Sequence, residues 1–361
     1  MTDGNYPTID VIVLLYKNPR FMPALFEGLA AQDYRRDCLT LHLVDNGPAD
    51  GSLAEAGRQM EKYADRLPKT VVHEPGRNLG FTAGNNLAMR QALERNADYC
   101  YLLNGDAAFE VGALKEAVKT AEADPAIGAV QSLLVLQQNP QEINSWGNAL
   151  HYLGFGYACG YRRPRIKAPH DVTDIAYPSG AGVLLRCSVL KKVGLFDETF
   201  GSYHEDLDLG WRIRLAKYRV VLAPLSVVEH HYEFSRSIQK WYWMERNRFL
   251  VILKNYKIAT LVWLAPQIVM SELALFIFAV VKGWWLDKLK VYGYFLKLGT
   301  WRHVCAERRV INSFRRIKDR EILRLTAPTI AYQDVESLPV KLIVNPVGRA
   351  LHWLTKVVVF W

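Results

Sequence analysis

The 361-residue sequence has no pattern of paired cysteines. Its five cysteines, Cys38, Cys100, Cys159, Cys187 and Cys305, are far apart, odd in number and free of any C-x-x-C motif. A disulfide framework is therefore not expected. The cysteines are instead expected to be reduced, mostly buried thiols in a cytosolic compartment. The amino terminus also lacks a basic segment ahead of its short apolar run, so no secretory signal peptide is expected.

The surplus of basic over acidic residues is confined to one segment of the chain. The net charge is +9, but residues 236–324 hold 18 Lys and Arg against 6 Asp and Glu, which leaves the remainder at about −3. A local surplus of this kind favours an anionic partner, either a phospholipid surface or nucleic acid. Long apolar runs beside the cations favour lipid, and no nucleic-acid partner is predicted.

No repeat or low-complexity tract interrupts the first part of the sequence, which alternates between two periodicities. Apolar runs at 8–15 and 39–44 predict buried strands, and 22–31 between them has helical spacing. The alternation continues with strands predicted at 70–73, 99–103, 127–136, 182–185 and 220–223, and with helices at 82–96, 111–123, 188–193 and 207–216. This order predicts a Rossmann-like, mainly parallel, doubly wound α/β sheet, whose strands carry ligand at their carboxyl ends.

Residues 139–178 depart from this pattern, because they are rich in Gly, Tyr and Pro and contain a basic cluster at 162–165. They are interpreted as an excursion over the sheet that forms part of the wall of a site. The predicted domains are 1–237, which is catalytic, and 238–361, which is helical, basic and apolar.

The second region contains a run of 24 residues, 258–281, that has one charge, Glu272, and one proline, Pro266. Its length suffices to span a bilayer, but both flanks are basic, so a single crossing would violate the positive-inside rule. A pair of helices broken near Pro266 and lying in one leaflet is therefore predicted. A spanning helix and an ordinary core or dimer face remain as alternatives.

The last residues predict a basic amphipathic helix, with Asn345 as its cap and Pro346 in its first turn. Its polar residues Arg349, His352 and Lys356 lie off the apolar face. That face comprises Val347, Ala350, Leu351, Leu354, Val357, Val358 and Trp361. Such a helix is a candidate for a membrane surface, and packing on the protein's own core is the alternative.

Two polar clusters follow predicted strands early in the chain. In VDNGPADGS, residues 44–52, an aspartate at a strand end can accept hydrogen bonds from a base or a ribose, although Asp-Asn-Gly is also a common turn. In NLGFTAGNN, residues 78–86, glycines and asparagines at a helix start offer amide donors, although a helix cap explains them equally well.

Two further clusters carry carboxylates. In YLLNGDAAF, residues 101–109, Asn104 and Asp106 follow a strand, and Asp106 can hold Mg²⁺ or Mn²⁺ that also binds phosphates; a plain turn is the alternative. In FDETFGSYHEDLDLGWRIR, Glu205, Asp206 and Asp208 crowd three carboxylates into four residues, which suits a general base or a cation site. Helix capping explains one of these acids but not three.

These motifs, followed by SGAGVLLR and HHYEFS, stand in an order that resembles the inverting family 2 glycosyltransferases of the GT-A fold. The sequence is most similar to the rhamnosyltransferase-like and galactofuranosyltransferase-like branch, and the resemblance covers about residues 8–250. It includes the segment ERNRFLVILKNY that commonly follows the catalytic domain.

The resemblance implies a role for each matching residue. Asp206 is the implied catalytic base, with Asp208 as its supporting acid and Glu205 as a competitor for the role; Asp106 and His230 are implied to bind the metal, with Ser235 completing the H-x-x-x-x-S motif. The implied donor-binding residues are Asp45, Asn46, Asn78, Gly80, Gly84, Asn85 and Asn104, and the implied acceptor-binding residues are Ser179, Gly180, Ala181 and Trp146.

The metal motif departs from the family pattern at two positions. Asn104 replaces its first acid, and Gly105 replaces the proline of the frequent N-P-D sequence, so a weaker or water-mediated contact of Asn104 with the metal is expected. The resemblance implies a transferase that uses Mn²⁺ or Mg²⁺ and a UDP- or dTDP-sugar, and that acts on a glycan or a lipid-linked acceptor of the cell surface. The basic and apolar second region predicts a peripheral or monotopic position at the inner face of the cytoplasmic membrane.

Two other classes of function fit the sequence less well. A nucleotidyltransferase would need a Gly-rich triphosphate loop after the first strand, and YKNPRF at 16–21 has no glycine. A non-catalytic scaffold subunit would not need Asp106, Asp206 and His230. The sequence leaves the donor sugar, the acceptor and the oligomeric state open, a homo-oligomer included.

Overall fold

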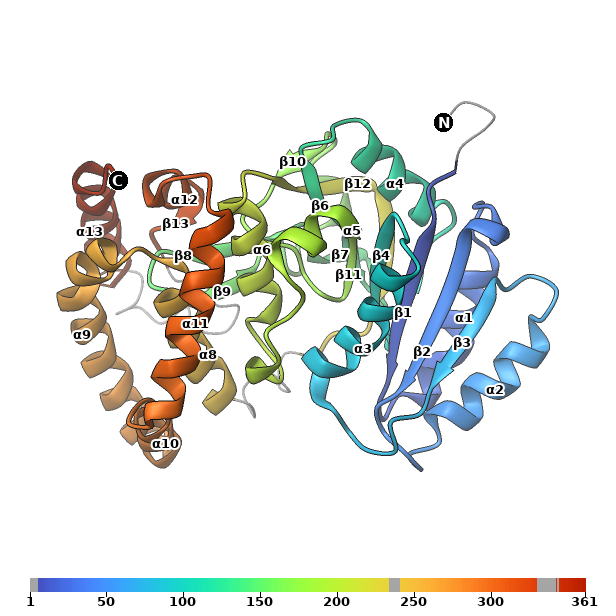
Figure 1. Ribbon diagram of the computed structural model, residues 1–361, viewed down its shortest axis with the longest axis horizontal. Helices are drawn as coiled ribbons and strands as arrows, with labels where there is room; N and C mark the ends of the chain where they lie inside the picture. Colours follow the sequence, from blue (N-terminus) through green and yellow to red (C-terminus); the bar gives the residue numbers. More distant parts are fainter. Residues whose placement is uncertain (1–5, 234–240, 330–341, 343) are drawn as a thin grey trace. The chain divides into compact units, whose positions relative to one another are not determined.

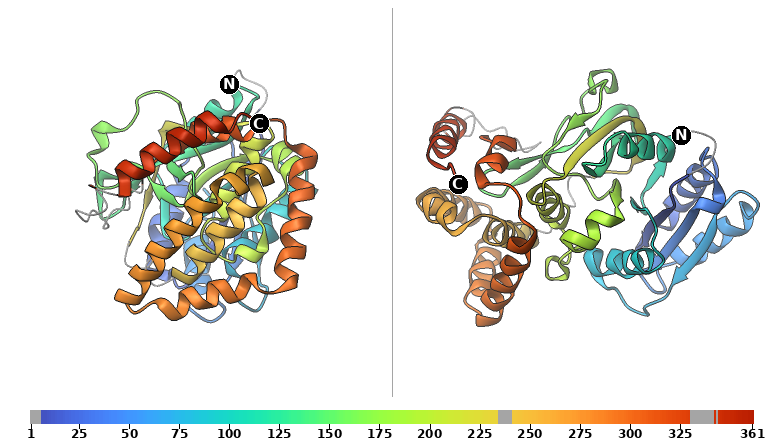
Figure 2. Two further views of the ribbon diagram at one scale, coloured as in Figure 1. Left: turned by 90° about the vertical axis from the view of Figure 1, so that its left-hand side faces the viewer. Right: turned by 45° about the horizontal axis from the view of Figure 1, so that its top comes forward.

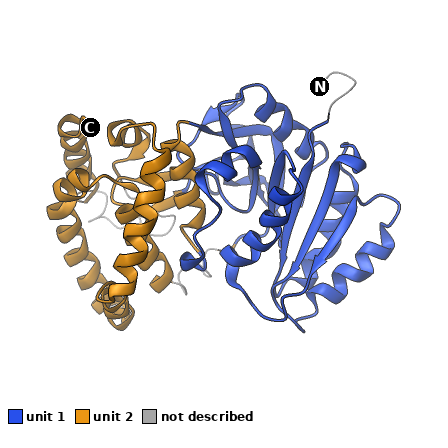
Figure 3. Cartoon of the chain, in the orientation of Figure 1, with its two compact units in different colours: residues 1–148, 158–202, 218–232 blue, residues 149–157, 203–217, 233–361 orange. Residues whose placement is uncertain are grey.

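The computed structural model describes residues 6–233, 241–329, 342 and 344–361. By its contacts the chain divides into two compact units, drawn in Figure 3. Unit 1 comprises residues 1–148, 158–202 and 218–232, and unit 2 comprises residues 149–157, 203–217 and 233–361. The predicted domain boundary at 237 and Ser235 of the predicted H-x-x-x-x-S motif both lie outside the described residues.

Unit 1 is built on a ten-stranded, mixed sheet (Figure 1). Its main path runs β10-β12-β6-β11-β4-β1-β2-β3, while β5 pairs with β12 and β7 with β6. The strands are β1 Ile9–Leu15, β2 Leu39–Asp45, β3 Lys69–His73, β4 Tyr99–Asn104, β5 Ala107–Phe109, β6 Ile127–Leu136, β7 Asn139–Ser145, β10 Thr173–Asp174, β11 Gly182–Arg186 and β12 Arg219–His230. Strands β4, β1, β2 and β3 run parallel, as do β6 and β12, and the predicted fold class is therefore confirmed.

Helices cover both faces of this sheet, which is why its central strands are buried and mostly apolar. Every residue of β1, β2 and β6 is buried. Alternate residues of β1 join one core with α1 (Met22–Ala30), α2 (Ser52–Lys62) and α4 (Ala113–Glu122). Helix α3 (Gly80–Glu94) contacts β1 and lies on the other face together with α5 (Cys187–Val193), as Figure 1 shows for α3. A strand buried on two sides has no polar face to expose.

Two parts of the sheet contain more strand than the sequence predicted. The excursion at 139–178 contains β7, which forms a hairpin with β6, in addition to β10. Its Gly and Pro content concealed strands that are held by pairing with neighbours and not by local propensity. Strand β12 continues to His230, well beyond the predicted end at Ala223, because a register shift between Ala223 and Val227 carries the chain past Pro224, which interrupts its apolar run.

Unit 2 consists mainly of helices (Figures 1 and 2). They are α6 Glu205–Leu215, α8 Trp241–Asn255, α9 Ile258–Val281, α10 Trp285–Phe295, α11 Leu298–Phe314, α12 Asp319–Leu325 and α13 Asn345–Val358. A small sheet of order β13-β8-β9 is formed by Thr326–Ala327, Asn148–His151 and Gly156–Ala158.

Two predictions about these helices are wrong. Helix α9 is a single helix of 24 residues with Pro266 inside it, not a broken pair. A proline removes one backbone hydrogen bond, and here the apolar sequence on both sides continues the helix. Helix α13 begins at Asn345 itself, so Val344 and not Asn345 occupies the cap position. Among the described residues, α9 is the one helix long and apolar enough to cross a membrane.

Candidate functional site

Three of the predicted metal-site residues come together at the carboxyl ends of β4 and β12 in unit 1. Asn104 ends β4, Asp106 lies in the turn before β5, and His230 ends β12. Antiparallel pairing of β5 with β12 places Ala107 opposite His230 and so fixes the register. The Nε2 atom of His230 lies 3.4 Å from Oδ1 of Asp106 and 3.3 Å from Nδ2 of Asn104.

The orientation of the His230 ring is set by Asn144, a residue of β7 that sequence reasoning missed. Nδ1 of His230 lies 2.9 Å from Oδ1 of Asn144, and both side chains are buried. A carbonyl oxygen can only accept, so Nδ1 donates to Asn144, and Nε2 faces Asp106. Nε2 donates to the carboxylate when the ring is protonated, and it offers a lone pair to a cation when the ring is neutral. Ligating histidines are commonly held in this way by a second residue. No local feature of the sequence indicated a partner 86 positions away.

The chemistry and spacing of this group fit a divalent cation. Two ligands at right angles on an octahedral ion lie about 3 Å apart, close to the separation of the Asp106 and His230 donor atoms. Burial by itself raises the pKa of the Asp106 carboxyl, but its hydrogen bond to His230 outweighs burial and holds the pKa below the usual range. The carboxyl is therefore ionised near neutral pH, as a metal ligand must be.

Gly105, which replaces the proline of the family pattern, occupies a position without room for a side chain. A Cβ atom there would lie 1.8 Å from Nδ2 of Asn18 and 2.5 Å from the carbonyl oxygen of Leu14. Asn18 is fixed in turn, since its Nδ2 donates to Leu14 O at 3.2 Å and its Oδ1 accepts from Tyr16 N at 3.2 Å. The loop after β1 thus fills the space that a residue other than glycine would need.

Asp45 lies at the carboxyl end of β2, two strands away from β4. Among the described residues, its Oδ1 atom is buried without a hydrogen-bond partner. Burial is the main cause of the raised pKa of this carboxyl, and a backbone hydrogen bond from Gly47 opposes the rise. A buried acceptor without a donor is costly, so this atom is suited to a hydrogen bond from a ligand.

The loop before α3 is tied to the end of β2 by Asn46. Its Oδ1 accepts from Leu79 N at 2.7 Å, and its Nδ2 donates to Gly80 O at 3.2 Å. Asn78 accepts from Gly80 N at 2.7 Å. These contacts bring Asn46, Asn78 and Gly80 together beside Asp45.

The start of α3 differs from what the sequence suggested. The amides of Phe81 and Thr82 donate to Gly201 O at 2.9 and 3.2 Å, so these predicted donors are used within the protein. Gly84 faces Leu14, where a Cβ atom would lie 2.9 Å from Cδ2, so packing of α3 on β1 accounts for this glycine. Asn85 is buried, and its side chain donates to Phe81 O on its own helix at 2.9 Å.

The predicted acceptor loop, residues 179–181, lies beside the metal-site residues. Asn104 N donates to Ala181 O at 3.1 Å, while Ser179 N donates to Oε1 of Gln131 at 2.8 Å. Gly180 packs against Phe81, which a Cβ atom would meet at 3.2 Å. Trp146 lies in a separate small cluster, next to Gly160.

The three acids of the E-D-x-D segment lie in the first turn of α6, in unit 2. Asp208 is fully buried: its Oδ2 lies 2.9 Å from Nε of Arg212 and 3.3 Å from Nζ of Lys254, and its Oδ1 accepts from Asn255 at 2.8 Å. Glu205 is also buried, whereas Asp206 is partly exposed. None of them caps the helix, because the cap residue is His204, so helix capping does not explain the cluster.

A strained turn precedes these acids and is supported by α8. Tyr203 and His204 have φ values of 69° and 66°, which residues with a Cβ atom seldom adopt. Asn247 of α8 donates to Tyr203 O at 2.6 Å. Burial lowers the pKa of His204 to about 4, so the imidazole is neutral near pH 7. Helix α8, from the segment ERNRFLVILKNY, therefore holds both the turn and Asp208.

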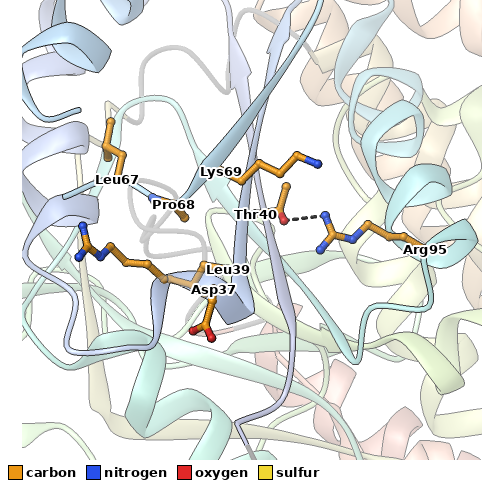
Figure 4. A pocket seen from close by; sticks show the side chains of 8 residues that line it. Asp37, Leu39, Thr40, Leu67, Pro68, Lys69 and Arg95 are labelled. Atoms are coloured by element: carbon orange, nitrogen blue, oxygen red, sulfur yellow. Dashed lines mark hydrogen bonds between the residues drawn. The ribbon is translucent and has the colours of Figure 1, made fainter. Parts of the chain in front are cut away.

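A pocket of about 490 Å³ lies at the other end of the sheet (Figure 4). It is lined by Arg36, Asp37, Leu39, Thr40, Leu67, Pro68, Lys69 and Arg95. Leu39 and Lys69 begin β2 and β3, so the pocket is at the amino ends of these strands. It contains none of the predicted site residues. Ligands of open α/β sheets bind at the carboxyl ends, where Asp45 and Asp106 lie.

A family model described as "Glycosyltransferase like family 2" matches residues 7–249. Among curated proteins, the chain is 26% identical over 209 residues to an N-acetylglucosaminyl-diphospho-decaprenol L-rhamnosyltransferase of Mycobacterium tuberculosis. The match covers 52% of this chain and 65% of that protein. The chain is also 28% identical over 238 residues to the O-antigen biosynthesis protein RfbC of Myxococcus xanthus, covering 64% of this chain and 18% of the relative.

Solved structures share the fold at low sequence identity. GalNAc-T7, solved with UDP, GalNAc and Mn²⁺, superposes with a TM-score of 0.55 at 15% identity, covering 70% of this chain and 48% of that one. S. aureus TarS 1-349, in complex with UDP-GlcNAc, superposes with a TM-score of 0.52 at 17% identity, covering 97% and 89%. At these identities the likeness shows a shared fold.

Proposed function

The chain belongs to glycosyltransferase family 2, and on this basis we propose that it transfers a sugar from a UDP- or dTDP-sugar to a hydroxyl group of a glycan or lipid-linked acceptor. The sugar proposed first is rhamnose, since the mycobacterial relative is named as an L-rhamnosyltransferase. The process is assembly of cell-surface polysaccharide, which the names of that relative and of RfbC support.

The observation that carries this proposal is the meeting of Asp106 and His230 at the same sheet edge as Asp45. The first two residues offer a carboxylate and an imidazole lone pair 3.4 Å apart. Asp45 offers a buried oxygen without a partner among the described residues. A nucleotide-diphosphate sugar needs both kinds of contact, one for its diphosphate and one for its base or ribose.

Asp106 and His230 are the residues that would hold Mn²⁺ or Mg²⁺, and Asn104 would contact the ion through its carbonyl or a water molecule. When bound, such an ion supplies positive charge that offsets the charge on a departing diphosphate. The neighbours solved with UDP and Mn²⁺, or with UDP-GlcNAc, support this choice of ligands. In this proposal Asp45 binds the base, and the donor is lined by Asn46, Asn78, Gly80 and Asn104. The acceptor is bound by Ser179, Gly180 and Ala181, while Trp146 packs in a separate cluster.

Asp206 is proposed as the general base. It takes the proton of the acceptor hydroxyl while the acceptor oxygen forms a bond to the anomeric carbon and the bond to the diphosphate breaks. A single displacement inverts the configuration at that carbon. Asp206 is favoured over its neighbours because Glu205 and Asp208 are buried, and Asp208 is already bonded to Arg212, Lys254 and Asn255. Asp208 acts as a positioning residue.

A lipid-linked acceptor resides in a membrane, so the proposal includes a peripheral or monotopic position at the inner face of the cytoplasmic membrane. The name of the mycobacterial relative, which acts on a decaprenol-linked diphosphate, supports a polyprenyl-diphosphate acceptor. The exposed apolar surface of unit 2 supports the same position.

A donor screen tests the proposal. Purified protein with Mn²⁺ is incubated with UDP-, dTDP-, GDP- and CMP-sugars, and release of the nucleotide and the thermal shift are both measured. A UDP- or dTDP-sugar should be hydrolysed slowly and should raise the melting temperature. Asp45→Asn should lose the shift without losing stability, because it removes a charge that burial disfavours. Absence of any response to all donors would overturn the proposal.

A further inference from the structure

Helix α9 of unit 2 presents an unbroken apolar stripe to its surroundings. The exposed side chains recur every three or four residues over the whole helix, which is about 36 Å long. They include Val262, Val269, Leu273 and Ile277, which are each 58 to 69% exposed. No charged residue is among the exposed residues of this helix. Soluble helices normally direct such a stripe toward the core.

The one charge of α9, Glu272, is turned to the inner side of the helix. It lies within contact of the Arg248 guanidinium, 2.7 Å from Nζ of Lys288 and 3.0 Å from the hydroxyl of Tyr292. Glu245 is a second acid in the cluster, 2.5 Å from Lys288. Two acids therefore face two cations. The charge of Glu272 is thus neutralised by ion pairs inside unit 2 and is not on the exposed side of the helix.

Two further polar side chains of α9 contact α13. Nε2 of Gln267 and Nε1 of Trp263 donate to the hydroxyl of Thr355 at 3.2 and 3.3 Å, and Gln267 and Thr355 are both buried. His352 of α13 is buried as well. The two helices contact each other, as Figure 2 also shows. Their interface therefore contains buried polar contacts, while the exposed side of α9 is apolar.

Helix α13 continues the apolar outer surface. Its outward residues include Trp353 at 64% and Val357 at 59% exposed, followed by Phe360. We propose that this lipid face, defined as the exposed apolar residues of α9 and α13, lies in one leaflet of an anionic bilayer with α9 parallel to the membrane plane. The inference deepens the proposed membrane position and does not depend on the proposed sugar transfer.

Charge complementarity selects lipid as the occupant. The exposed ionisable residues on α13 are Arg349 and Lys356, and exposed Lys282 and Lys290 follow α9. Cations beside an apolar face bind anionic headgroups while the apolar side chains enter the acyl region. A second copy of the chain would bring like charges together across the same face, which costs free energy.

The buried charges argue for an orientation along the membrane plane. Glu272 lies near the middle of α9, and its partners Arg248 and Lys288 belong to α8 and α10. A spanning α9 would therefore carry these three charges into the hydrocarbon. Burying such charges in hydrocarbon is costly. A helix lying in the plane keeps the charged cluster on its protein side and the lipid face on the other.

Vesicle flotation of the full chain tests the inference. Vesicles of phosphatidylcholine alone are compared with vesicles containing phosphatidylglycerol, and the wild type should bind the anionic vesicles more strongly. Val262→Glu, Val269→Glu and Ile277→Glu should each lower the partition constant about tenfold. Val111→Glu is the matched control, because Val111 is 73% exposed in unit 1, and it should bind like the wild type.

Three outcomes would overturn the inference. Unchanged binding of all three variants would exclude the lipid face. A loss confined to Val269→Glu near the centre, with Val262→Glu and Ile277→Glu unaffected, would indicate a spanning helix. A dimer in lipid-free solution that Val269→Glu converts to a monomer, without vesicle binding by the wild type, would indicate a second copy as the occupant. Circular dichroism of each variant verifies that it is folded, and slow donor hydrolysis should persist in all of them.

Discussion

Asn144 accepts a hydrogen bond from Nδ1 of His230 at 2.9 Å, on the side of the ring opposite the Nε2 atom that faces Asp106. The pair links β7, in a segment expected to be an excursion, with the end of β12. It explains how a histidine at a strand end presents a lone pair to the proposed metal site in a fixed direction.

Removing the acceptor at position 144 should weaken metal binding. Asn144→Leu leaves Nδ1–H of His230 without its partner, so the ring loses its fixed orientation, and the affinity for Mn²⁺ should fall about 10- to 100-fold. Asn144→Asp keeps an acceptor oxygen and should retain most of the affinity. Calorimetric titration of Mn²⁺ in the presence of UDP measures both. Equal affinities for Asn144→Leu and the wild type would show that His230 does not need this support.

Gly105 should not tolerate the proline that its family often has there. Both Gly105→Pro and Gly105→Ala add a Cβ atom that would overlap Asn18, and each should lower the free energy of unfolding by about 1 to 3 kcal/mol or more. Gly57→Ala is the matched control: it lies inside α2, no atom lies within 4 Å of its added Cβ, and it should be neutral or slightly stabilising. Urea denaturation compares the three. A Gly105→Ala variant as stable as Gly57→Ala would contradict the tight turn.

Substitution of Asp206 should lower the rate of transfer, whereas substitution of Asp208 should lower stability. Asp208→Asn removes the carboxylate that faces the buried cations of Arg212 and Lys254, although Lys254 keeps Glu307 at 3.3 Å, and should cost about 3 to 5 kcal/mol of unfolding free energy. Asp206→Asn should unfold like the wild type and still bind donor, but transfer should fall by at least about 100-fold because no base accepts the proton. Denaturation and transfer assays on both variants measure the two effects. Near wild-type transfer by Asp206→Asn would refute its role as the base.

The neutral state of His204 should make unit 2 sensitive to acid. Burial lowers the pKa of this imidazole to about 4, whereas the unfolded chain protonates near 6.5. Below pH 6.5 the unfolded state therefore takes up a proton that the folded state does not bind until about pH 4. Lowering the pH from 7 to 5 should reduce the free energy of unfolding by about 2 kcal/mol through this group. His204→Asn cannot titrate and tolerates the positive φ, so it should lose less stability between pH 7 and pH 5 than the wild type does. Equal losses in urea denaturation would contradict the assignment.

The parallel strands and the polar residues at their ends could be predicted because both depend on local sequence. The apolar runs of β1, β2 and β6 are buried on two faces, and Asp45, Asn104 and His230 stand where these or neighbouring strands end. The family order of the motifs then identified the fold and the class of enzyme.

Features that depend on distant contacts could not be predicted. Asn144 reaches His230 only through the pairing of β7 with β6, and Asn18 excludes a side chain at Gly105 only through the course of the loop after β1. Pro266 suggested a break because its local effect is known, but the long apolar helix α9 continues through it. The inward turn of Glu272 requires Arg248 and Lys288, which belong to other helices.

The most direct test of the account is metal-dependent turnover of the donor that the screen identifies. The wild type is stripped with EDTA, assayed for nucleotide-diphosphate release, and assayed again after Mn²⁺ is restored, with Asp106→Ala treated in parallel. The account predicts that EDTA abolishes release, that Mn²⁺ restores it to the wild type, and that Asp106→Ala stays inactive although it is folded. Release that is unaffected by EDTA and persists in Asp106→Ala would contradict it.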